Sequence, residues 1–265
     1  MSSKEIWFYI AASYSFSWLM WLPLLVNGQF GLDLPTVRYQ HFLGAFGPCF
    51  GALVTSVLVH GSAGLKSFLR RALNPRISLW CYVFAVTSPF LFFIIAAGIA
   101  YPFEGSLVNF GSLGLTEKIS SGNFLFVWVF WIVTYGVGEE VGWRGYLLPK
   151  IAGVTQTATA AVIVAQYWAL WHLPAFFYDG GIEARGMAII GWYIGLVFGS
   201  ILLAWLTRNA RWSVIPAIIW HGTFNLTIAS DQAEGMIAAI ISVMVIVTAI
   251  VLRRVHGQEL AAKRC

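Results

Sequence analysis

The sequence predicts an all-α, polytopic membrane protein: a bundle of about eight transmembrane helices in one membrane domain, residues 1–265. Hydrophobic residues make up 59% of the chain and charged residues only 10%, against about 25% charged in soluble proteins. The 13 Trp, 20 Phe and 10 Tyr suit the aromatic belts at the two membrane surfaces. The apolar residues also fall in runs of about 20, the length that crosses a hydrocarbon core of ~30 Å.

Each predicted helix is justified by the length of its apolar run and by the polar residues that bound it. The first run is longer than the core of a signal peptide and no small-residue cleavage site follows it, so we expect a membrane helix. The connection 101–123 is rich in Gly and Ser and predicts a long outer loop. In order, the eight predicted spans are residues 6–26, 40–60, 78–100, 124–142, 158–178, 187–207, 213–229 and 235–252.

The basic residues indicate the orientation in the membrane. If the N-terminus is cytoplasmic, 13 of the 16 basic residues fall on the cytoplasmic side, and only Arg38, Lys118 and Arg185 fall outside. The positive-inside rule therefore predicts that both termini are cytoplasmic. The compact chain without a targeting sequence favours a prokaryotic plasma membrane. The net charge of +5 comes from short loops rather than from a basic patch, so we expect no nucleic-acid partner.

Six ionisable or polar side chains interrupt the apolar runs and are the candidate functional residues. They are Glu139, Glu140, Arg144, His172, His221 and Asn225, which lie in the segments GVGEEVGWRGY, QYWALWHLPAFF and IPAIIWHGTFN. A charged side chain at the centre of a bilayer costs from ~3 to over 10 kcal/mol, so it normally faces the protein interior and carries a function. All six therefore predict a site inside the bundle.

Helix geometry gives the two glutamates different roles. Neighbouring residues of a helix point about 100° apart, so Glu139 and Glu140 cannot share one role. Glu140 and Arg144 are four residues apart and can pair. Glu139 is then left without a dedicated partner and is a candidate general base. The alternative is an ordinary Glu–Arg pair where a helix ends at the membrane surface.

The other two segments add complementary groups. His172 precedes Pro174, which is expected to break the helix and free backbone carbonyls. Within a membrane such carbonyls are tolerated only beside protein or a water-filled cavity; the alternative is a hydrogen-bonded core histidine. His221 and Asn225 share one helix face and can donate to a developing oxyanion; the alternative is a polar contact between helices. Each alternative is reasonable alone, but the three segments together favour one shared site.

The three segments resemble the motifs of the CPBP family, the CaaX proteases and bacteriocin-processing enzymes also known as the Abi family. EEVGWRG matches the pattern EExxxR, WALWH places an aromatic residue four positions before a His, and HGTFN matches HxxxN. Their order and spacing also agree, and the resemblance covers about 124–229. Trp168 stands where the family often has Phe.

The resemblance implies an intramembrane endopeptidase with a cavity open toward the cytosol. By this resemblance Glu139 and His172 activate the attacking water, His221 and Asn225 stabilise the oxyanion, and the Glu–Arg pair of the first motif holds the site in place. It also implies a protein or peptide substrate, prenylated or not, that is cleaved near its C-terminus and met within membrane lipid.

No cofactor is expected, because Glu139 can act directly as a base and Asn225 suits an oxyanion better than a metal ion. The alternative is a metalloendopeptidase, in which Glu139, His172 and His221 would be the ligands of Zn. The chain contains no HExxH sequence.

Two other classes of protein compete with the protease. A membrane transporter or proton-coupled channel also uses Glu and His within the membrane, but the sequence has no broken helices in two related halves. A non-catalytic bacteriocin-immunity protein is the third class, and the complete set of motifs argues against it.

Overall fold

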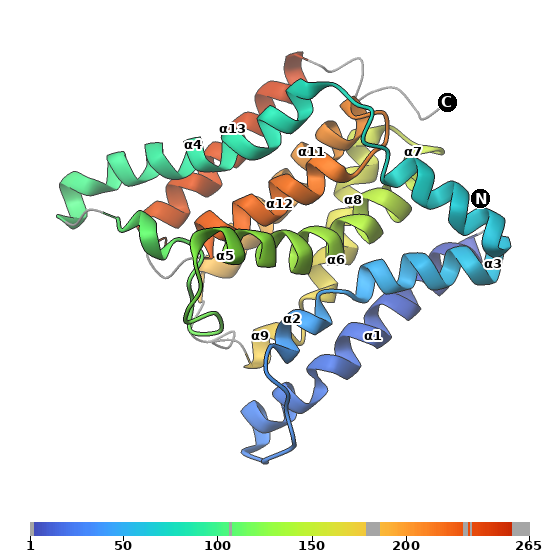
Figure 1. Cartoon of the computed structure of the whole chain (residues 1–265), viewed down its shortest axis with the longest axis horizontal. Coiled ribbons are helices and arrows are strands. Elements are labelled where there is room, and N and C mark those ends of the chain that lie inside the picture. The colour runs from blue at the N-terminus through green and yellow to red at the C-terminus, as the bar shows by residue number, and fades with distance from the viewer. Residues whose placement is uncertain (1–2, 106–107, 179–185, 230–232, 234, 256–265) are drawn as a thin grey trace.

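The computed structural model describes residues 3–105, 108–178, 186–229, 233 and 235–255. These residues form helices and no strand. Figure 1 shows α1 (Ser3–Phe30) and α3 (Gly47–Ala72) side by side at one edge of the bundle, connected through the short helix α2 (Gln40–Gly44). The predicted outer residue Arg185 and the C-terminal tail 256–265 lie outside the described residues.

The rest of the bundle is built around α12 (Ile215–Ile228), which packs against α4, α5 and α11. In turn, α11 packs against α8 and α13. The bounds of these helices are α4 (Leu79–Glu104), α5 (Phe124–Trp131), α8 (Thr157–Trp171), α11 (Ala188–Asn209) and α13 (Met236–Val255). In Figure 1, α4 and α13 lie on the opposite edge from α1 and α3.

Seven helical segments of the described chain are long and apolar enough to cross a membrane. They are Lys4–Phe30, Gln40–Ala72, Leu79–Glu104, Phe124–Ala152, Thr157–Tyr178, Ala188–Asn209 and Met236–Val255. They overlap seven of the eight predicted spans, which confirms the prediction of an all-α, polytopic membrane protein. That the chain is a single domain stays a prediction.

The eighth predicted span, 213–229, is shorter in the structure than the sequence suggested. It corresponds to α12, whose 14 residues measure about 21 Å at 1.5 Å per residue, less than the ~30 Å hydrocarbon core. Pro216 stands in its first turn, where its missing N–H leaves no hydrogen bond unmade. Most of α12 is buried among its neighbours, so protein rather than lipid surrounds this apolar run.

The helical stretch Phe124–Ala152, which carries the first motif, is not a uniform α-helix. After α5 it continues as a π-helical segment η2 (Ile132–Val137), the short α6 (Gly138–Glu140), a second π-helical segment η3 (Val141–Leu147) and α7 (Leu148–Ala152). The π-helical turn is rare and often marks a functional site. Both glutamates lie in α6, between the two π-helical segments.

Two glycines allow this stretch to pack closely against both of its neighbours. A Cβ atom at Gly142 would lie 2.3 Å from the carbonyl oxygen of Pro48 in α3, and one at Gly136 would lie 2.4 Å from that of Ile218 in α12. Both distances are far below a van der Waals contact, so a larger residue would force the backbones apart. The stretch is therefore fixed between α3 and α12.

We expect Gly142→Ala to lower the melting temperature of the purified protein in detergent. The added methyl group meets the backbone of α3, which cannot move as a flexible side chain would, and overpacking of this kind costs about 1–3 kcal/mol. Gly98→Ala in α4 is the matched control, because a Cβ there meets no atom within 4 Å. Equal melting temperatures for the two variants would contradict the close packing.

Candidate active site

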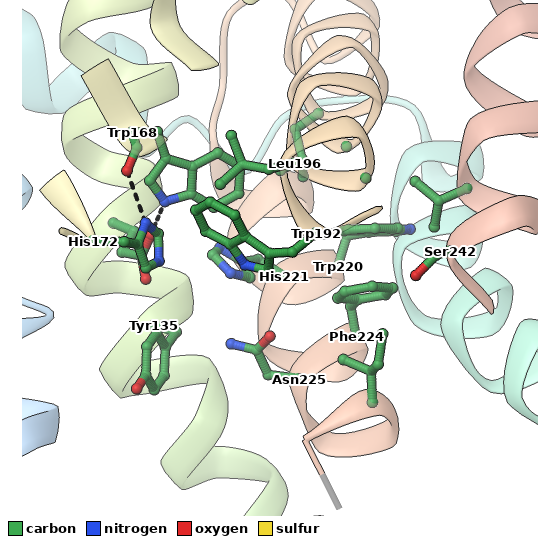
Figure 2. A pocket seen from close by; sticks show the side chains of 16 residues that line it. Tyr135, Trp168, His172, Trp192, Leu196, Trp220, His221, Phe224, Asn225 and Ser242 are labelled. Carbon is green, nitrogen blue, oxygen red and sulfur yellow. Dashed lines mark hydrogen bonds between the residues drawn. The ribbon is translucent and has the colours of Figure 1, made fainter. Parts of the chain in front are cut away.

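Three helices bring four of the six predicted residues to one pocket of about 210 Å³ (Figure 2). Glu139 comes from α6, His172 from the end of α8, and His221 and Asn225 from α12. Side chains of α11 and α13 complete the wall. The remaining two predicted residues do not line the pocket but are buried beside it.

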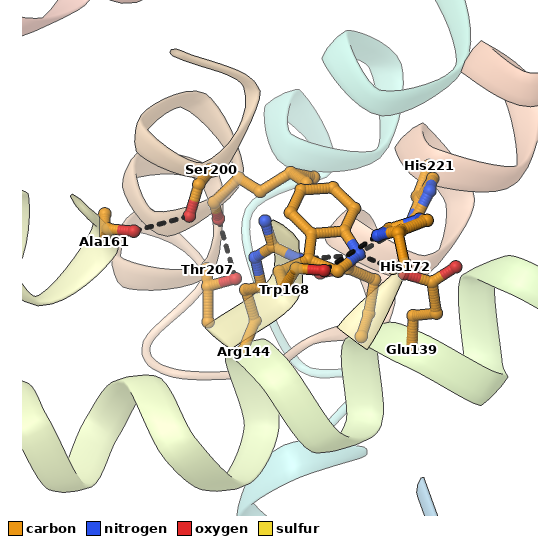
Figure 3. Close-up of polar contacts among 10 residues, drawn as sticks. Glu139, Arg144, Ala161, Trp168, His172, Ser200, Thr207 and His221 are labelled. Carbon is orange, nitrogen blue, oxygen red and sulfur yellow. Dashed lines mark hydrogen bonds and ion pairs between the residues drawn. The ribbon is translucent and has the colours of Figure 1, made fainter. Parts of the chain in front are cut away.

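Glu139 is a buried carboxylate at the wall of the pocket, with a side chain that is 1% exposed. Its Oε2 accepts a hydrogen bond from the indole Nε1–H of Trp168 at 2.5 Å (Figure 3). The prediction that Glu139 has no dedicated partner is therefore wrong, because α8 places a donor beside it. The donor is neutral, so it orients the carboxylate without forming an ion pair that would compete with a proton.

Glu140 connects two other predicted residues. Its Oε1 accepts a hydrogen bond from Nη1 of Arg144 at 2.8 Å and another from Nδ1 of His221 at 2.8 Å. All three side chains are buried. The predicted Glu140–Arg144 pair is confirmed, whereas the contact with His221 was missed, because it depends on how α6 and α12 face each other. With Nδ1 engaged, His221 has Nε2 left for a ligand in the pocket.

Arg144 is also in contact with an aromatic face. The carbon of its guanidinium lies 4.2 Å from the centre of the Trp168 ring, within the range of a cation–π interaction. A buried ion pair must recover the cost of removing both charges from water. The carboxylate of Glu140 and the ring of Trp168 therefore share the stabilisation of one buried cation.

The predicted helix break at Pro174 is confirmed. The helix α8 ends at Trp171, and a separate short helix, α9 (Ala175–Tyr178), begins after the proline. His172 lies at this break, where its Nδ1 donates to the carbonyl oxygen of Trp168 at 2.7 Å. This contact orients the imidazole at the end of the helix, and its ring is partly exposed at the wall of the pocket.

His221 and Asn225 share one face of α12, as their spacing predicted, and Figure 2 shows both at the pocket. An imidazole and a carboxamide at adjacent turns can donate to the same atom of a ligand. Glu139 reaches the pocket from a different helix, so a carboxylate, an imidazole and a carboxamide line the same pocket.

Part of the pocket wall is apolar and was not predicted. Leu196, Phe224 and Val245 contribute to it. Gly195 and Gly199 of α11 also line the pocket, and a Cβ at either position would meet no atom within 4 Å. Glycines one turn apart on an apolar helix were a signal that the sequence contained, but they are common in membrane helices and did not stand out. They leave an open apolar groove beside the polar groups.

The described residues do not fit the Zn alternative. No group of three or more His, Cys, Asp or Glu side chains in the described part of the chain is arranged to hold a metal ion. We therefore derive no step through a metal ion.

The fold and the pocket define a membrane protein with a buried Glu–His site, and comparisons with known proteins specify the family. Residues 121–227 match the family model described as type II CAAX prenyl endopeptidase Rce1-like. The chain is also similar to the CAAX prenyl protease 2 of the archaeon Methanococcus maripaludis, with 27% identity over 172 residues. Both findings support the CPBP, or CaaX protease, family of integral membrane proteins that the three motifs predicted.

The similarity does not extend over the whole of either protein. The alignment with the archaeal relative covers 61% of this chain and 60% of that protein. The matched segment 121–227 contains all three motifs. The helices α1 to α4 precede the matched segment, so the family match does not cover them.

We expect Glu140→Gln and Arg144→Met each to lower the melting temperature in detergent strongly. Each change leaves the other charge of a buried pair without its partner, at a cost of roughly 3–5 kcal/mol. The double variant should regain part of the lost stability, because it removes both charges and the two effects are coupled.

Glu139→Gln is the matched control, since it makes the same chemical change one residue away. The amide oxygen of Gln can still accept the hydrogen bond from Trp168, so the melting temperature should stay nearly unchanged or rise. Equal destabilisation by Glu139→Gln and Glu140→Gln, together with additive effects of Glu140→Gln and Arg144→Met, would refute this division of roles.

Proposed function

We propose that this protein is an intramembrane endopeptidase that hydrolyses a peptide bond near the C-terminus of a protein or peptide. The single observation that carries the proposal is the position of Glu139: a buried carboxylate at the wall of a pocket, opposite hydrogen-bond donors on another helix. The match of residues 121–227 to a prenyl endopeptidase family supports the same reaction.

In the proposed mechanism Glu139 and His172 hold a water molecule against the carbonyl carbon of the scissile bond. Glu139 takes a proton from this water while the water oxygen forms a bond to the carbonyl carbon. The carbonyl oxygen then becomes an oxyanion. The oxyanion accepts hydrogen bonds from Asn225 and His221. When the C–N bond breaks, Glu139 returns the proton to the leaving nitrogen, and the products are a new carboxyl group and a new amine.

Glu140 takes part by fixing the imidazole of His221. Because the Nδ1–H of His221 is donated to Glu140, a donor at Nε2 requires the doubly protonated ring, in which an imidazolium faces the Glu140 carboxylate. The amide of Asn225 donates without such a condition. We therefore propose a supporting role for Glu140 next to the reacting atoms, and its burial and its pair with Arg144 support this role.

We further propose that the substrate carries a prenyl chain and enters from the lipid. The apolar groove along Gly195 and Gly199 is open, and it adjoins the polar groups of the pocket. An extended hydrocarbon chain fits beside a helix that presents no side chains at these positions. The name of the archaeal relative, CAAX prenyl protease 2, supports this class of substrate.

The proposed orientation places the basic end of the bundle in the cytoplasm of a prokaryotic cell. Arg71 bonds the carbonyl of Gly145, and Lys150 pairs with Glu5 near the start of α1, so these cations gather at one end. The start of α1, the end of α3 and α7 lie near one another at this end (Figure 1).

We expect the purified protein in detergent to cleave a farnesylated peptide that ends in a CaaX sequence, and to cleave the unprenylated peptide more slowly. Glu139→Gln, His172→Ala and His221→Ala should abolish cleavage, and Asn225→Ala should reduce it about 10²–10³-fold, as the loss of one oxyanion donor does. The measurement is release of the C-terminal tripeptide by mass spectrometry, with melting temperatures to confirm folding.

A strong chelator, added in the same assay, should leave the rate unchanged. Near-normal cleavage by Glu139→Gln would refute the proposed mechanism. Uptake or proton flux in vesicles without any proteolysis would instead favour the transporter class. The absence of both transport and proteolysis would favour the immunity protein.

We expect Asp33→Cys and Lys118→Cys, in a variant without the three native cysteines, to react with a membrane-impermeant maleimide added outside intact cells. Lys66→Cys should react only after the membrane is opened, because α1 and α3 carry Asp33 and Lys66 to opposite ends of the bundle. All three side chains are exposed. Labelling of Lys66→Cys in intact cells would show that the orientation is inverted.

A further inference from the structure

We propose that Trp168 is a positioning residue, whose indole N–H holds the Glu139 carboxylate so that its other oxygen is available to the attacking water. The kinetic part of this inference rests on the proposed function. The contact itself does not, and it can be tested on the protein without any substrate.

The Glu139 carboxylate has a defined hydrogen-bond donor beside it. Trp168 is 7% exposed and donates from Nε1 to Oε2 of Glu139. Within the described part of the chain, this is the one hydrogen bond to the Glu139 side chain. A carboxylate bound at one oxygen has its plane and its second oxygen fixed. Trp168 therefore determines which oxygen of Glu139 is available at the wall of the pocket.

The same indole contacts the other charged groups of the site through different parts of the ring. Its face lies against the guanidinium of Arg144. Its ring centre is 5.6 Å from that of His221 in an edge-to-face arrangement. Figure 3 shows Arg144 and Glu139 on different sides of Trp168. Replacement of the indole nitrogen alone would remove the hydrogen bond to Glu139 and would leave the ring contacts with Arg144 and His221 in place.

Without this donor, the Glu139 carboxylate could turn toward other partners. The guanidinium of Arg144 and the imidazole of His221 both lie against the same Trp168 ring that bonds Glu139, so both are potential partners of the carboxylate. A carboxylate that turned to form a direct ion pair would be oriented away from the water and would be a weaker base. The bond from Trp168 opposes this movement, because it satisfies one oxygen with a neutral donor in a fixed place.

The test separates the N–H group from the ring. Trp168→Phe keeps an aromatic face for Arg144 and the backbone carbonyl for His172, but it removes the donor. Replacement of Trp168 by 3-benzothienylalanine keeps the size of the indole and exchanges only the N–H for sulfur. Both variants should lose on the order of 10²-fold in kcat, as a reacting group displaced by about 1 Å does, with KM within about twofold of the unchanged protein.

Trp131→Phe is the matched control. Trp131 is also buried, at 4% exposure, and its Nε1–H donates to the carbonyl of Gly114 at 3.0 Å, away from the pocket. The Trp131→Phe variant loses an equivalent hydrogen bond. It should therefore change the melting temperature about as much as Trp168→Phe does, but it should leave kcat unchanged. An unchanged kcat in the benzothienylalanine variant of an active enzyme would overturn the inference.

A double-mutant cycle supplies the readout that needs no activity. Melting temperatures are measured for Trp168→Phe, Glu139→Leu and the double variant. Non-additive shifts are expected, because the two side chains share one bond, whereas additive shifts would overturn the inference. If the unchanged protein cleaves no substrate, the proposed function fails, and the cycle alone decides whether Trp168 positions Glu139.

Discussion

The rest of the site depends on the hydrogen bonds that the carboxylate of Glu140 accepts. It lies in a helix that carries the first motif, and one of its oxygens binds both Arg144 in the same helix and His221 in α12. A buried carboxylate cannot turn to water for other partners, so these two bonds fix the rotation of α12 against α6. That rotation directs Asn225 and the free edge of His221 into the pocket. The geometry of the candidate oxyanion donors is thus set from outside the pocket.

The relations within one helix could be predicted from the sequence, and those between helices could not. The spacing of four residues determines that Glu140 meets Arg144 and that His221 and Asn225 share a face, whatever surrounds them. The bonds from Glu140 to His221 and from Trp168 to Glu139 depend on the depth and rotation of separate helices. For that reason the sequence gives no sign that Glu139 has a partner, and its expected isolation was wrong.

The same contrast applies to the fold. Hydropathy predicted seven spans that the structure confirms, because lipid demands about 20 apolar residues of any helix that crosses it. It overestimated α12, since an apolar run that is buried among other helices looks the same in the sequence as one that faces lipid. The break at Pro174 could be predicted, because proline acts locally. The π-helical segments beside Glu139 and Glu140 could not be predicted; they lie where the stretch packs closely against α3 and α12.

The shortness of α12 has a consequence for how the protein is made. A helix of 14 residues that is mostly buried gains little from lipid and depends on protein neighbours for its place. Its neighbours α4, α5 and α11 all precede it in the chain and are synthesised first. His221 and Asn225 therefore reach the pocket only when the earlier helices are already assembled in the membrane. A partly synthesised chain displays Glu139 without His221 and Asn225, so the proposed site stays incomplete until the synthesis of the chain is nearly finished.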